Sequence, residues 1–500
     1  MSKYILAIDQ GTTGTTAMLF DGSGGVMAKV NHEIPQYFPR GGWVEHDPEE
    51  IWTSVLETVE EALGKAGVGA ADIATIGITN QRETSVFWKR DTLEPVGRAI
   101  VWQCRRSADI CEQLKLDGLE EIFRSKTGLT IDPYFSGTKI TWKMKNDPEF
   151  AKMAQAGKVC FGTIDSWLLA KITGGRLHAT DYSNASRTLM FNIRELDWDE
   201  ELLEILGVPR AILPEVRPSS AFFGETDPAS FFSETIPIGG IVGDQQAALF
   251  GQACYRPGMT KNTYGTGSFV LMNTGEQPVD SKTGMLTTIA WGLDGKVTYA
   301  LEGSIFATGA AIQWLRDGLR IIDNVEQTGP IAEAVKDTGG VYFVPALVGL
   351  GAPYWDPYAR GAIVGITRGT TREQIIRATV ESMAYQVRDV VGAMESDSGI
   401  KVTSLRVDGG ASVMNVLLQF LSDLLGVEVR RPVVAETTAL GAAYLAGLGA
   451  GYFKDVDEVE RIWRSERGFE PAAEGGVMDI KYSGWKQAVE RARYREEPKE

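Results

Sequence analysis

The 500-residue sequence has few cysteines, few histidines and no long apolar run. Its cysteines are widely separated, and no two of them form a Cys-x-x-Cys pair: Cys104, Cys111, Cys160 and Cys254. No histidine stands near a cysteine at zinc-ligand spacing, so a disulfide framework and a zinc site are not expected. The apolar stretch at residues 4–8 is too short for a signal peptide, and no segment could span a bilayer. We expect a cytoplasmic protein without membrane insertion.

Positive charge is also in deficit. The chain has 50 Lys and Arg against 66 Asp and Glu, for a net charge of -16. Binding to a phosphate backbone requires clustered basic residues that displace counterions, so no nucleic-acid partner is expected. Hydrophobic residues make up 43% of the chain, which is enough for substantial cores. At this length, two or more domains are favoured over one.

Two common phosphate-transfer signatures are absent. The Gly-Lys pairs at residues 64–65, 157–158 and 295–296 precede Ala, Val and Val, so none of them completes a P-loop. The chain contains neither a His-Arg-Asp nor an Asp-Phe-Gly sequence, which excludes a protein-kinase catalytic loop. Any phosphate bound here is therefore held by backbone loops and carboxylates rather than by a P-loop lysine.

The first half of the sequence predicts an α/β fold with a mixed sheet. Apolar runs separated by glycine turns predict an antiparallel meander at residues 4–8, 17–20 and 26–30. Asp47 and Pro48 then provide a cap and a first-turn proline for a helix. Further strands, with helical crossovers between them, are predicted at residues 73–79, 99–102 and 159–163.

The second half repeats this plan. A turn at residues 255–258 leads into a strand and hairpin at residues 261–273. Buried strands then alternate with amphipathic helices: strands at 342–344 and 405–407, and helices near 304–319, 372–394 and 413–425. We therefore predict a duplicated fold with domains at residues 1–253 and 254–500 and a ligand in the cleft between them.

Three loops rich in glycine and hydroxyl groups follow predicted strands, at residues 8–16, 264–268 and 407–411. Glycine allows the backbone to approach a ligand closely, and Asp9 supplies a carboxylate suited to Mg²⁺ beside phosphates. One such loop alone is more typical of an ordinary turn. Three of them favour a nucleotide site.

Other polar residues stand at predicted strand ends, where open α/β sheets bind ligands. Arg82 and Glu83 could donate to and accept from the hydroxyls of a polyol, although a solvated turn is the simpler interpretation. Trp102 could cover a carbon skeleton, or it could belong to the core. Asp244 precedes an apolar helical run, where it could be a helix cap or an ionised base for phosphoryl transfer to an alcohol.

Several blocks together resemble the FGGY carbohydrate kinases, and among them the glycerol kinases: residues 9–13, 80–84, 132–139, 243–248, 264–269, 349–356 and 408–411. The resemblance runs nearly from end to end. It implies two duplicated actin-like, ribonuclease-H-like ATPase domains with mixed sheets flanked by helices. It also implies transfer of the ATP γ-phosphoryl group to glycerol, giving sn-glycerol 3-phosphate and ADP.

The same resemblance implies roles for individual residues. The glycerol hydroxyls would be bound by Arg82, Glu83, Tyr134, Asp244 and Gln245, with Asp244 as general base. The carbon face of glycerol would lie between Trp102 and Phe269. The nucleotide would contact residues of both halves: Thr12, Thr13, Gly14, Thr266, Gly309, Gln313 and Gly410. Asp9 would hold Mg²⁺ through water.

The chain departs from the family pattern at three positions. Gly14, Thr16 and Met414 stand where serine, arginine and asparagine are common, so we expect altered nucleotide affinity. Residues 230–236 lack the glycine-rich, arginine-bearing loop that binds fructose 1,6-bisphosphate in some relatives. They also lack the histidine that is phosphorylated in others, so neither form of regulation is expected.

Two alternative functions remain open at this stage. One is a related FGGY kinase that acts on another polyol or on a sugar. The other is an actin-like or chaperone-like ATPase with no small acceptor, although the Asp244-Gln245 segment argues against it. The resemblance further favours a homodimer or homotetramer.

Overall fold

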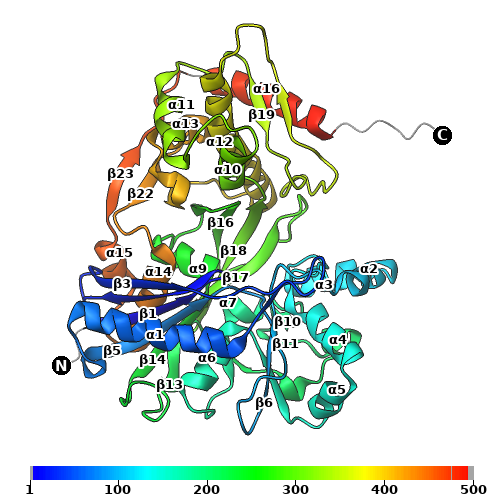
Figure 1. The fold of residues 1–500 in the computed structure, drawn as a ribbon, viewed down its shortest axis with the longest axis vertical. Helices are drawn as coiled ribbons and strands as arrows, with labels where there is room; N and C mark the ends of the chain where they lie inside the picture. The colour runs from blue at the N-terminus through cyan, green and yellow to red at the C-terminus, as the bar shows by residue number, and fades with distance from the viewer. Residues whose placement is uncertain (1–3, 475, 494–500) are drawn as a thin grey trace.

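The computed structural model describes residues 4–474 and 476–493, which form an α/β protein built on two large mixed sheets. In Figure 1 the first sheet lies in the lower part of the molecule. Four helices of the second half lie in its upper part: α10 (Gly309–Asp317), α11 (Thr328–Ala334), α12 (Arg372–Ser398) and α13 (Asn415–Leu425). Within the described ranges, no helix combines the length and the apolar character needed to cross a membrane.

The first sheet has the strand order β13-β14-β5-β1-β2-β3. Its strands are β1 (Tyr4–Gln10), β2 (Gly14–Phe20), β3 (Val26–Glu33), β5 (Ile73–Asn80), β13 (Ser220–Glu225) and β14 (Pro237–Gly243). Strands β1 to β3 form an antiparallel meander, as the sequence predicts, while β1, β5 and β14 run parallel. Helix α1 (Pro48–Ala66) packs on β2 and β3, and at its start the Asp47 side chain accepts a hydrogen bond from the Glu49 backbone N–H (2.9 Å). The predicted helix cap is confirmed.

The second sheet has the order β17-β18-β16-β15-β21-β22-β23. Its strands are β15 (Met259–Tyr264), β16 (Ser268–Gly275), β17 (Leu286–Leu293), β18 (Lys296–Ile305), β21 (Ser404–Gly409), β22 (Val429–Pro432) and β23 (Ser465–Phe469). Strands β15, β16 and β18 repeat the antiparallel meander, and β21 and β22 add to it in parallel. The duplicated α/β plan predicted from the sequence is therefore present.

Helices flank both sheets. Those of the first half are α1 (Pro48–Ala66), α2 (Ala108–Leu116), α3 (Glu120–Thr127), α4 (Ser136–Asn146), α5 (Pro148–Gln155), α6 (Ile164–Ile172), α7 (Tyr182–Ala185), α8 (Glu200–Leu206) and α9 (Asp244–Gly251). Those of the second half are α10 (Gly309–Asp317), α11 (Thr328–Ala334), α12 (Arg372–Ser398), α13 (Asn415–Leu425), α14 (Thr437–Gly449), α15 (Val456–Ile462) and α16 (Val477–Arg493). Four 3₁₀ turns complete the helical segments: η1 (Ala70–Asp72), η2 (Arg210–Ile212), η3 (Val325–Gln327) and η4 (Gly410–Val413).

Two predicted strands of the first half lie outside its large sheet, which corrects the sequence-based expectation, while the strand predicted at residues 342–344 is present with these bounds in a separate pair. The runs at residues 99–102, 159–163 and 342–344 form two-stranded pairs: β4 (Glu45–His46) with β7 (Ala99–Ile100), β6 (Val86–Lys89) with β8 (Val159–Gly162), and β19 (Tyr342–Val344) with β20 (Ala362–Val364). Two further pairs are β9 (Ala179–Asp181) with β12 (Glu215–Arg217) and β10 (Phe191–Asn192) with β11 (Asp197–Trp198). A short apolar run shows that a strand is buried, but it does not specify the partner strand.

The predicted helix at residues 304–319 also begins later than expected. Residues 304 and 305 end strand β18, and α10 starts at Gly309. The apolar residues of a buried strand run directly into those of the helix, so the hydrophobic pattern alone does not mark the boundary.

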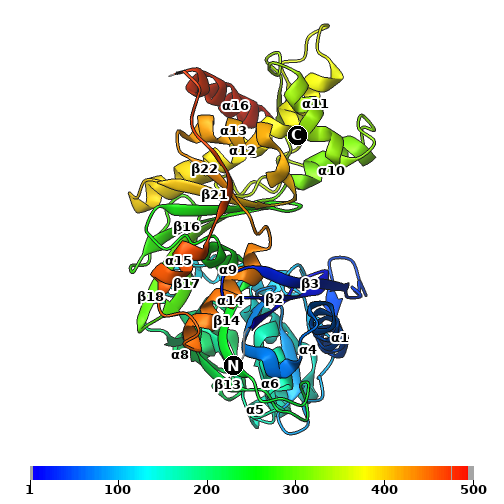
Figure 2. The ribbon, with the colours of Figure 1, turned by 90° about the vertical axis from the view of Figure 1, so that its left-hand side faces the viewer.

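Helices α9 and α14 cross between the two sheets, side by side in Figure 2. Although α14 belongs to the second half of the chain, it packs against β1, β5 and β14 of the first sheet. The crossing is very close, because a Cβ atom on Gly441 would lie 1.9 Å from the carbonyl oxygen of Ala247. The helix junction that joins the two halves therefore depends on glycine at this point.

We expect Gly441→Ala to lower the free energy of unfolding by about 1–3 kcal/mol, because the added methyl group forces two helix backbones apart. Gly392→Ala in α12 is the matched control, since a Cβ atom added there would meet nothing within 4 Å. That substitution should stabilise the protein by about 0.5–1 kcal/mol through helix propensity. Thermal unfolding of both variants measures the difference, and equal midpoints would contradict the close crossing.

Candidate active site

The carboxyl ends of three parallel strands meet at one edge of the first sheet. Gln10 at the end of β1 pairs with Asn80 at the end of β5, and Asn80 pairs with Gly243 at the end of β14. The segments that follow these strands carry the predicted loop residues Thr12 and Thr13, the Arg82-Glu83 pair, and Asp244 with Gln245. The sheet register thus brings together side chains that are far apart in the sequence.

Residues 80–84 are almost completely buried, with exposed fractions of 0–3%. The interpretation as a solvated turn is therefore wrong. Glu83 has a φ of 63°, an uncommon left-handed conformation for a residue with a side chain. Its backbone carbonyl accepts a hydrogen bond from the hydroxyl of Ser136 (2.9 Å) at the start of α4. Such strain is typical of functional sites.

Arg82 contacts the side chain that the sequence singles out as a general base. Its Nε lies 3.1 Å from Oδ1 of Asp244, and the Asp244 side chain is 28% exposed. Asp244 is the first residue of α9, whereas Gly243 occupies the cap position. The Asp244 carboxylate is therefore not the helix cap, although its Oδ1 accepts a hydrogen bond from the Gln245 backbone N–H (2.7 Å), and it remains accessible to a ligand.

Arg82 also forms an ion pair with a residue that the sequence analysis missed. Its Nη1 and Nη2 donate to Oε2 and Oε1 of Glu302 at 2.6 Å and 3.2 Å. Glu302 lies on β18 of the second sheet and is completely buried. The only sign of this ion pair in the sequence was a charged residue within an otherwise mostly apolar stretch.

Arg187 completes the buried network and was also missed. Its Nε donates to Glu83 (2.7 Å) and its Nη2 to Glu302 (3.0 Å). Burial alone would raise the pKa of Glu302, but the charges of Arg187 and Arg82 and the hydrogen bond from Arg82 lower it to about 2. Burial raises the pKa of Glu83, against the effect of the two arginines. Glu302 is therefore ionised within this network.

Two of the predicted aromatic residues stand beside this network. The rings of Trp102 and Tyr134 meet edge to face with centroids 5.3 Å apart, and Tyr134 lies 5.8 Å from the Arg187 guanidinium. The indole N–H of Trp102 donates to the hydroxyl of Thr12 (2.9 Å), which links the Trp102–Tyr134 ring pair to the first glycine loop. Phe269 lies on β16 and packs against the apolar cluster around α9 and α14.

Gln245 is held by a third missed residue, Lys261 on β15. The Lys261 ammonium group donates to the Gln245 side-chain oxygen (2.5 Å) and to Thr263 (2.9 Å). Burial lowers the pKa of Lys261 to about 8, although nearby carboxylates, including Asp408 and Asp244, oppose the shift. The contact fixes the first turn of α9 against the second sheet.

The second sheet presents a matching edge. Tyr264 at the end of β15 pairs with Gly409 at the end of β21. Gly409 has a φ of 83°, and a Cβ there would lie 2.2 Å from the Tyr264 carbonyl oxygen, so this position requires glycine. The backbone N–H of Gly309, at the start of α10, donates to the carbonyl of Gly265 (3.1 Å).

The predicted nucleotide residues of the second half lie on the elements around this edge. Gln313 is exposed one turn after Gly309 on α10, Thr266 is exposed in the β15–β16 loop, and Gly410 follows β21. Gly409 and Gly410 help to line a cavity of about 560 Å³, which is a common size for a small-ligand site.

The three departures from the family pattern have local structural partners. A Cβ on Gly14 would lie 2.5 Å from the His32 carbonyl oxygen, so a side chain there would displace β3. The Thr16 hydroxyl accepts a hydrogen bond from Asn31 (2.9 Å) on β3. Met414 is buried at the start of α13.

Asp9 is the carboxylate most suited to a cation. Burial, and to a lesser extent the charge of Asp244, raises the pKa of Asp9 to about 7. No cluster of three or more His, Cys, Asp or Glu residues that could hold a metal ion occurs among the residues that the structure describes. A single carboxylate without a complete protein ligand set fits a cation that keeps water and phosphate oxygens as most of its ligands, as is usual for Mg²⁺.

The sequence matches the N-terminal domain of the FGGY family of carbohydrate kinases over residues 4–251 and its C-terminal domain over residues 260–450. Glycerol kinase 2 of Thermotoga maritima is 61% identical over 490 residues, which cover 98% of this chain and 99% of that protein. The glycerol kinase of Caldanaerobacter subterraneus subsp. tengcongensis is 61% identical over 492 residues, which cover 98% and 99%.

Solved structures agree with these matches. The crystal structure of Plasmodium falciparum glycerol kinase with ADP has a TM-score of 0.93 at 36% identity, and the alignment covers 99% of both chains. Gluconate kinase from Lactobacillus acidophilus has a TM-score of 0.86 at 22% identity over 98% of this chain and 96% of that one. The latter likeness concerns the fold alone.

We expect Glu302→Gln to lower the free energy of unfolding by about 3–5 kcal/mol, because Arg82 and Arg187 would keep buried charges without their shared carboxylate. The control is Glu200→Gln, which removes an exposed ion pair to Arg210 in which the glutamate is 73% exposed. That change should cost less than about 1 kcal/mol. Urea denaturation at neutral pH measures both, and equal losses would contradict the network.

The same variant should alter the pH dependence of stability. The pKa of Glu302 falls from an ordinary 4.5 to about 2 in the folded protein. Its stabilisation is therefore fully present above pH 4.5 and is lost as the pH falls toward 2. Wild type should lose more stability than Glu302→Gln across this window, and parallel acid-denaturation curves would be inconsistent with a depressed pKa.

Proposed function

Because the chain belongs to the FGGY family of carbohydrate kinases, we propose that it transfers the γ-phosphoryl group of ATP to glycerol, giving sn-glycerol 3-phosphate and ADP. The observation that carries this proposal is 61% identity to glycerol kinases over 98% of the chain. The buried Arg82 network beside an accessible carboxylate supports it, since a polyol requires both donors and acceptors. The reaction would be the first step of glycerol breakdown.

In this proposal, the first-sheet edge holds the acceptor. Arg82 and Glu83 bind hydroxyls from a fixed, buried position, so little conformational freedom is lost when the acceptor binds. Tyr134 and Gln245 contact further hydroxyls, and Trp102 covers the carbon chain. Phe269 would form the opposite wall when the two halves close over the ligand.

Asp244 acts as the general base. Phosphoryl transfer has a loose transition state in which the hydroxyl proton leaves late, so one carboxylate near the acceptor oxygen is sufficient. The guanidinium of Arg82 at 3.1 Å orients that carboxylate. Asp244 accepts the proton while the acceptor oxygen attacks the γ-phosphorus atom.

The nucleotide lies between the glycine loops of the two sheets. Thr12 and Thr13 face the terminal phosphates with Gly14 beside them, and Thr266 belongs to the second phosphate loop. Gly309, Gln313 and Gly410 line the adenosine side. Asp9 would hold Mg²⁺, which would supply neutralisation of the phosphate charge.

We further propose that the acceptor pocket and first phosphate loop belong to a domain of residues 1–253, and the second phosphate loop and adenosine site to residues 254–500. The strands of the first sheet all precede this boundary and those of the second sheet all follow it. Helix α14 follows the boundary in the sequence but packs against the first sheet. The chain acts in the cytoplasm. It forms a homodimer or homotetramer, and analytical ultracentrifugation would test this oligomeric state.

We expect Asp244→Asn to reduce kcat by about 10²–10⁴-fold while leaving ATP binding nearly unchanged, because the amide cannot accept the proton. Asp197→Asn is the control, since Asp197 forms an exposed ion pair with Arg210. A coupled ADP-release assay measures turnover. Near-normal turnover of the Asp244 variant would remove this residue from the base role.

A panel of glycerol, dihydroxyacetone, xylulose and ribulose distinguishes the proposed acceptor from a sugar. The aromatic pair of Trp102 and Tyr134 restricts the space beside Arg82, so glycerol should give the highest kcat/KM. ADP release should also require Mg²⁺. A preference for a five-carbon sugar would favour another FGGY kinase, and ATP turnover that is independent of every acceptor would favour an actin-like ATPase.

A further inference from the structure

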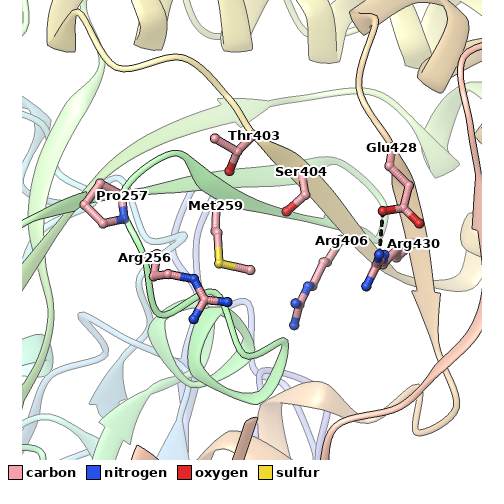
Figure 3. A pocket seen from close by; sticks show the side chains of 8 residues that line it. All are labelled: Arg256, Pro257, Met259, Thr403, Ser404, Arg406, Glu428 and Arg430. Atoms are coloured by element: carbon pink, nitrogen blue, oxygen red, sulfur yellow. Dashed lines mark ion pairs between the residues drawn. The ribbon is translucent and has the colours of Figure 1, made fainter. Parts of the chain in front are cut away.

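A second pocket lies at the opposite edge of the second sheet from the glycine loops. Strands β15 and β21 begin at this edge with Met259 and Ser404, and β22 begins next to them. The cavity measures about 420 Å³ and is lined by Arg256, Arg406 and Arg430 among others. In Figure 3 the guanidinium groups of Arg256 and Arg406 project toward one space, with Arg430 beside it. None of these residues belongs to the proposed active site.

Arg406 is a buried cation without a carboxylate partner in the described part of the chain. Only 5% of the residue is exposed, its Nη1 donates to the carbonyl of Gln252, and its buried Nε has no hydrogen-bond partner among the described residues. The guanidinium lies 3.8 Å from the ring centroid of Trp463, which offsets part of its desolvation. A buried charge of this kind is costly unless an anion balances it.

The two other arginines are available to an anion. Arg256 pairs with Glu460 (2.9 Å) and its side chain is 62% exposed, while Arg430 pairs with Glu428 (2.7 Å) and is 40% exposed. Exposed ion pairs of this kind contribute little to stability, so a better anion can replace either carboxylate. The three arginines and their two glutamate partners leave a local excess of positive charge, in contrast to the net charge of -16 of the whole chain.

We propose that this pocket is a second, regulatory anion site that binds a small phosphate ester. Converging guanidinium groups match the oxygens of a phosphate group and donate to them bidentately. The hydroxyls of Thr403 and Ser404 also line the cavity, and its volume exceeds what a free phosphate ion fills. The remaining space accommodates the carbon part of an ester.

The site is joined to the catalytic machinery through Arg406. Gln252, whose carbonyl Arg406 contacts, follows the last residue of α9, and Asp244 is the first residue of that helix. The Gln252 side-chain amide donates to Asp408 (2.9 Å), which precedes the Gly409-Gly410 loop. An anion that binds Arg406 therefore acts on the end of α9 and on the Gly409-Gly410 loop. Anion binding should consequently change the KM for ATP.

The binding test is calorimetric titration of the full chain, saturated with glycerol and Mg-ADP, with inorganic phosphate and separately with ribose 5-phosphate. We expect the ester to bind more tightly than phosphate. The double variant Arg256→Gln/Arg430→Gln should weaken ester binding by about tenfold or more, since it removes two of the three guanidinium groups that would donate to the anion. Both positions are exposed, so the fold should be retained.

Arg210→Gln is the matched control, because Arg210 is an exposed arginine that pairs with Asp197 far from the pocket. It should bind both probes as wild type does. No binding by wild type, or equal binding by wild type and the double variant, would overturn the site. Binding of phosphate without binding of the ester would overturn the assignment of an ester.

Coupling to the nucleotide loop rests on the proposed kinase activity and has its own measurement. Ribose 5-phosphate should change the KM for ATP at least twofold in wild type and in Arg210→Gln, but not in the double variant. Ester binding with an unchanged KM would refute the coupling. A chain that binds the ester but lacks glycerol phosphorylation would refute the proposed function and leave the anion site intact.

Discussion

The buried ion pair between Arg82 and Glu302 is the interaction on which the site depends, because it joins the two sheets. Arg82 follows a strand of the first sheet, and Glu302 lies within a strand of the second. Removing two charges from water is costly, and here Arg187 offsets part of that cost by donating to the same glutamate. The position of Asp244, which contacts Arg82, is thereby set by both halves of the chain.

The close crossing of α9 and α14 sets the distance between the two sheets. Helix α9 starts with Asp244 at the edge of the first sheet, and Gln252, which follows its last residue, contacts Asp408 of the second sheet. Gly441 allows α14 to approach α9 closely enough for both helices to fit between the sheets. One short helix therefore connects the proposed base with the Gly409-Gly410 loop and the arginine pocket.

Local features were predictable from the sequence, and long-range partners were not. The Asp47 cap, the first meander and the repeated second sheet follow from hydrophobic period and turn residues. Arg82 was recognisable from its place after a strand. Its partner Glu302 is 220 positions further along the chain, and no periodic pattern links residues at that distance. Arg187 is likewise 115 positions from Glu302. Lys261 is only 16 positions from Gln245, but the two residues lie on opposite sides of the junction between the halves, which no local pattern marks.

The most direct test is a crystal structure of the chain with glycerol and a non-hydrolysable ATP analogue bound together. A general base must lie within about 2.6–3.2 Å of the oxygen whose proton it accepts. The account predicts that an Asp244 carboxylate oxygen lies at this distance from a terminal hydroxyl of glycerol, with that hydroxyl in line with the γ-phosphorus atom. A terminal hydroxyl directed away from Asp244, or glycerol bound outside the Arg82 network, would contradict it.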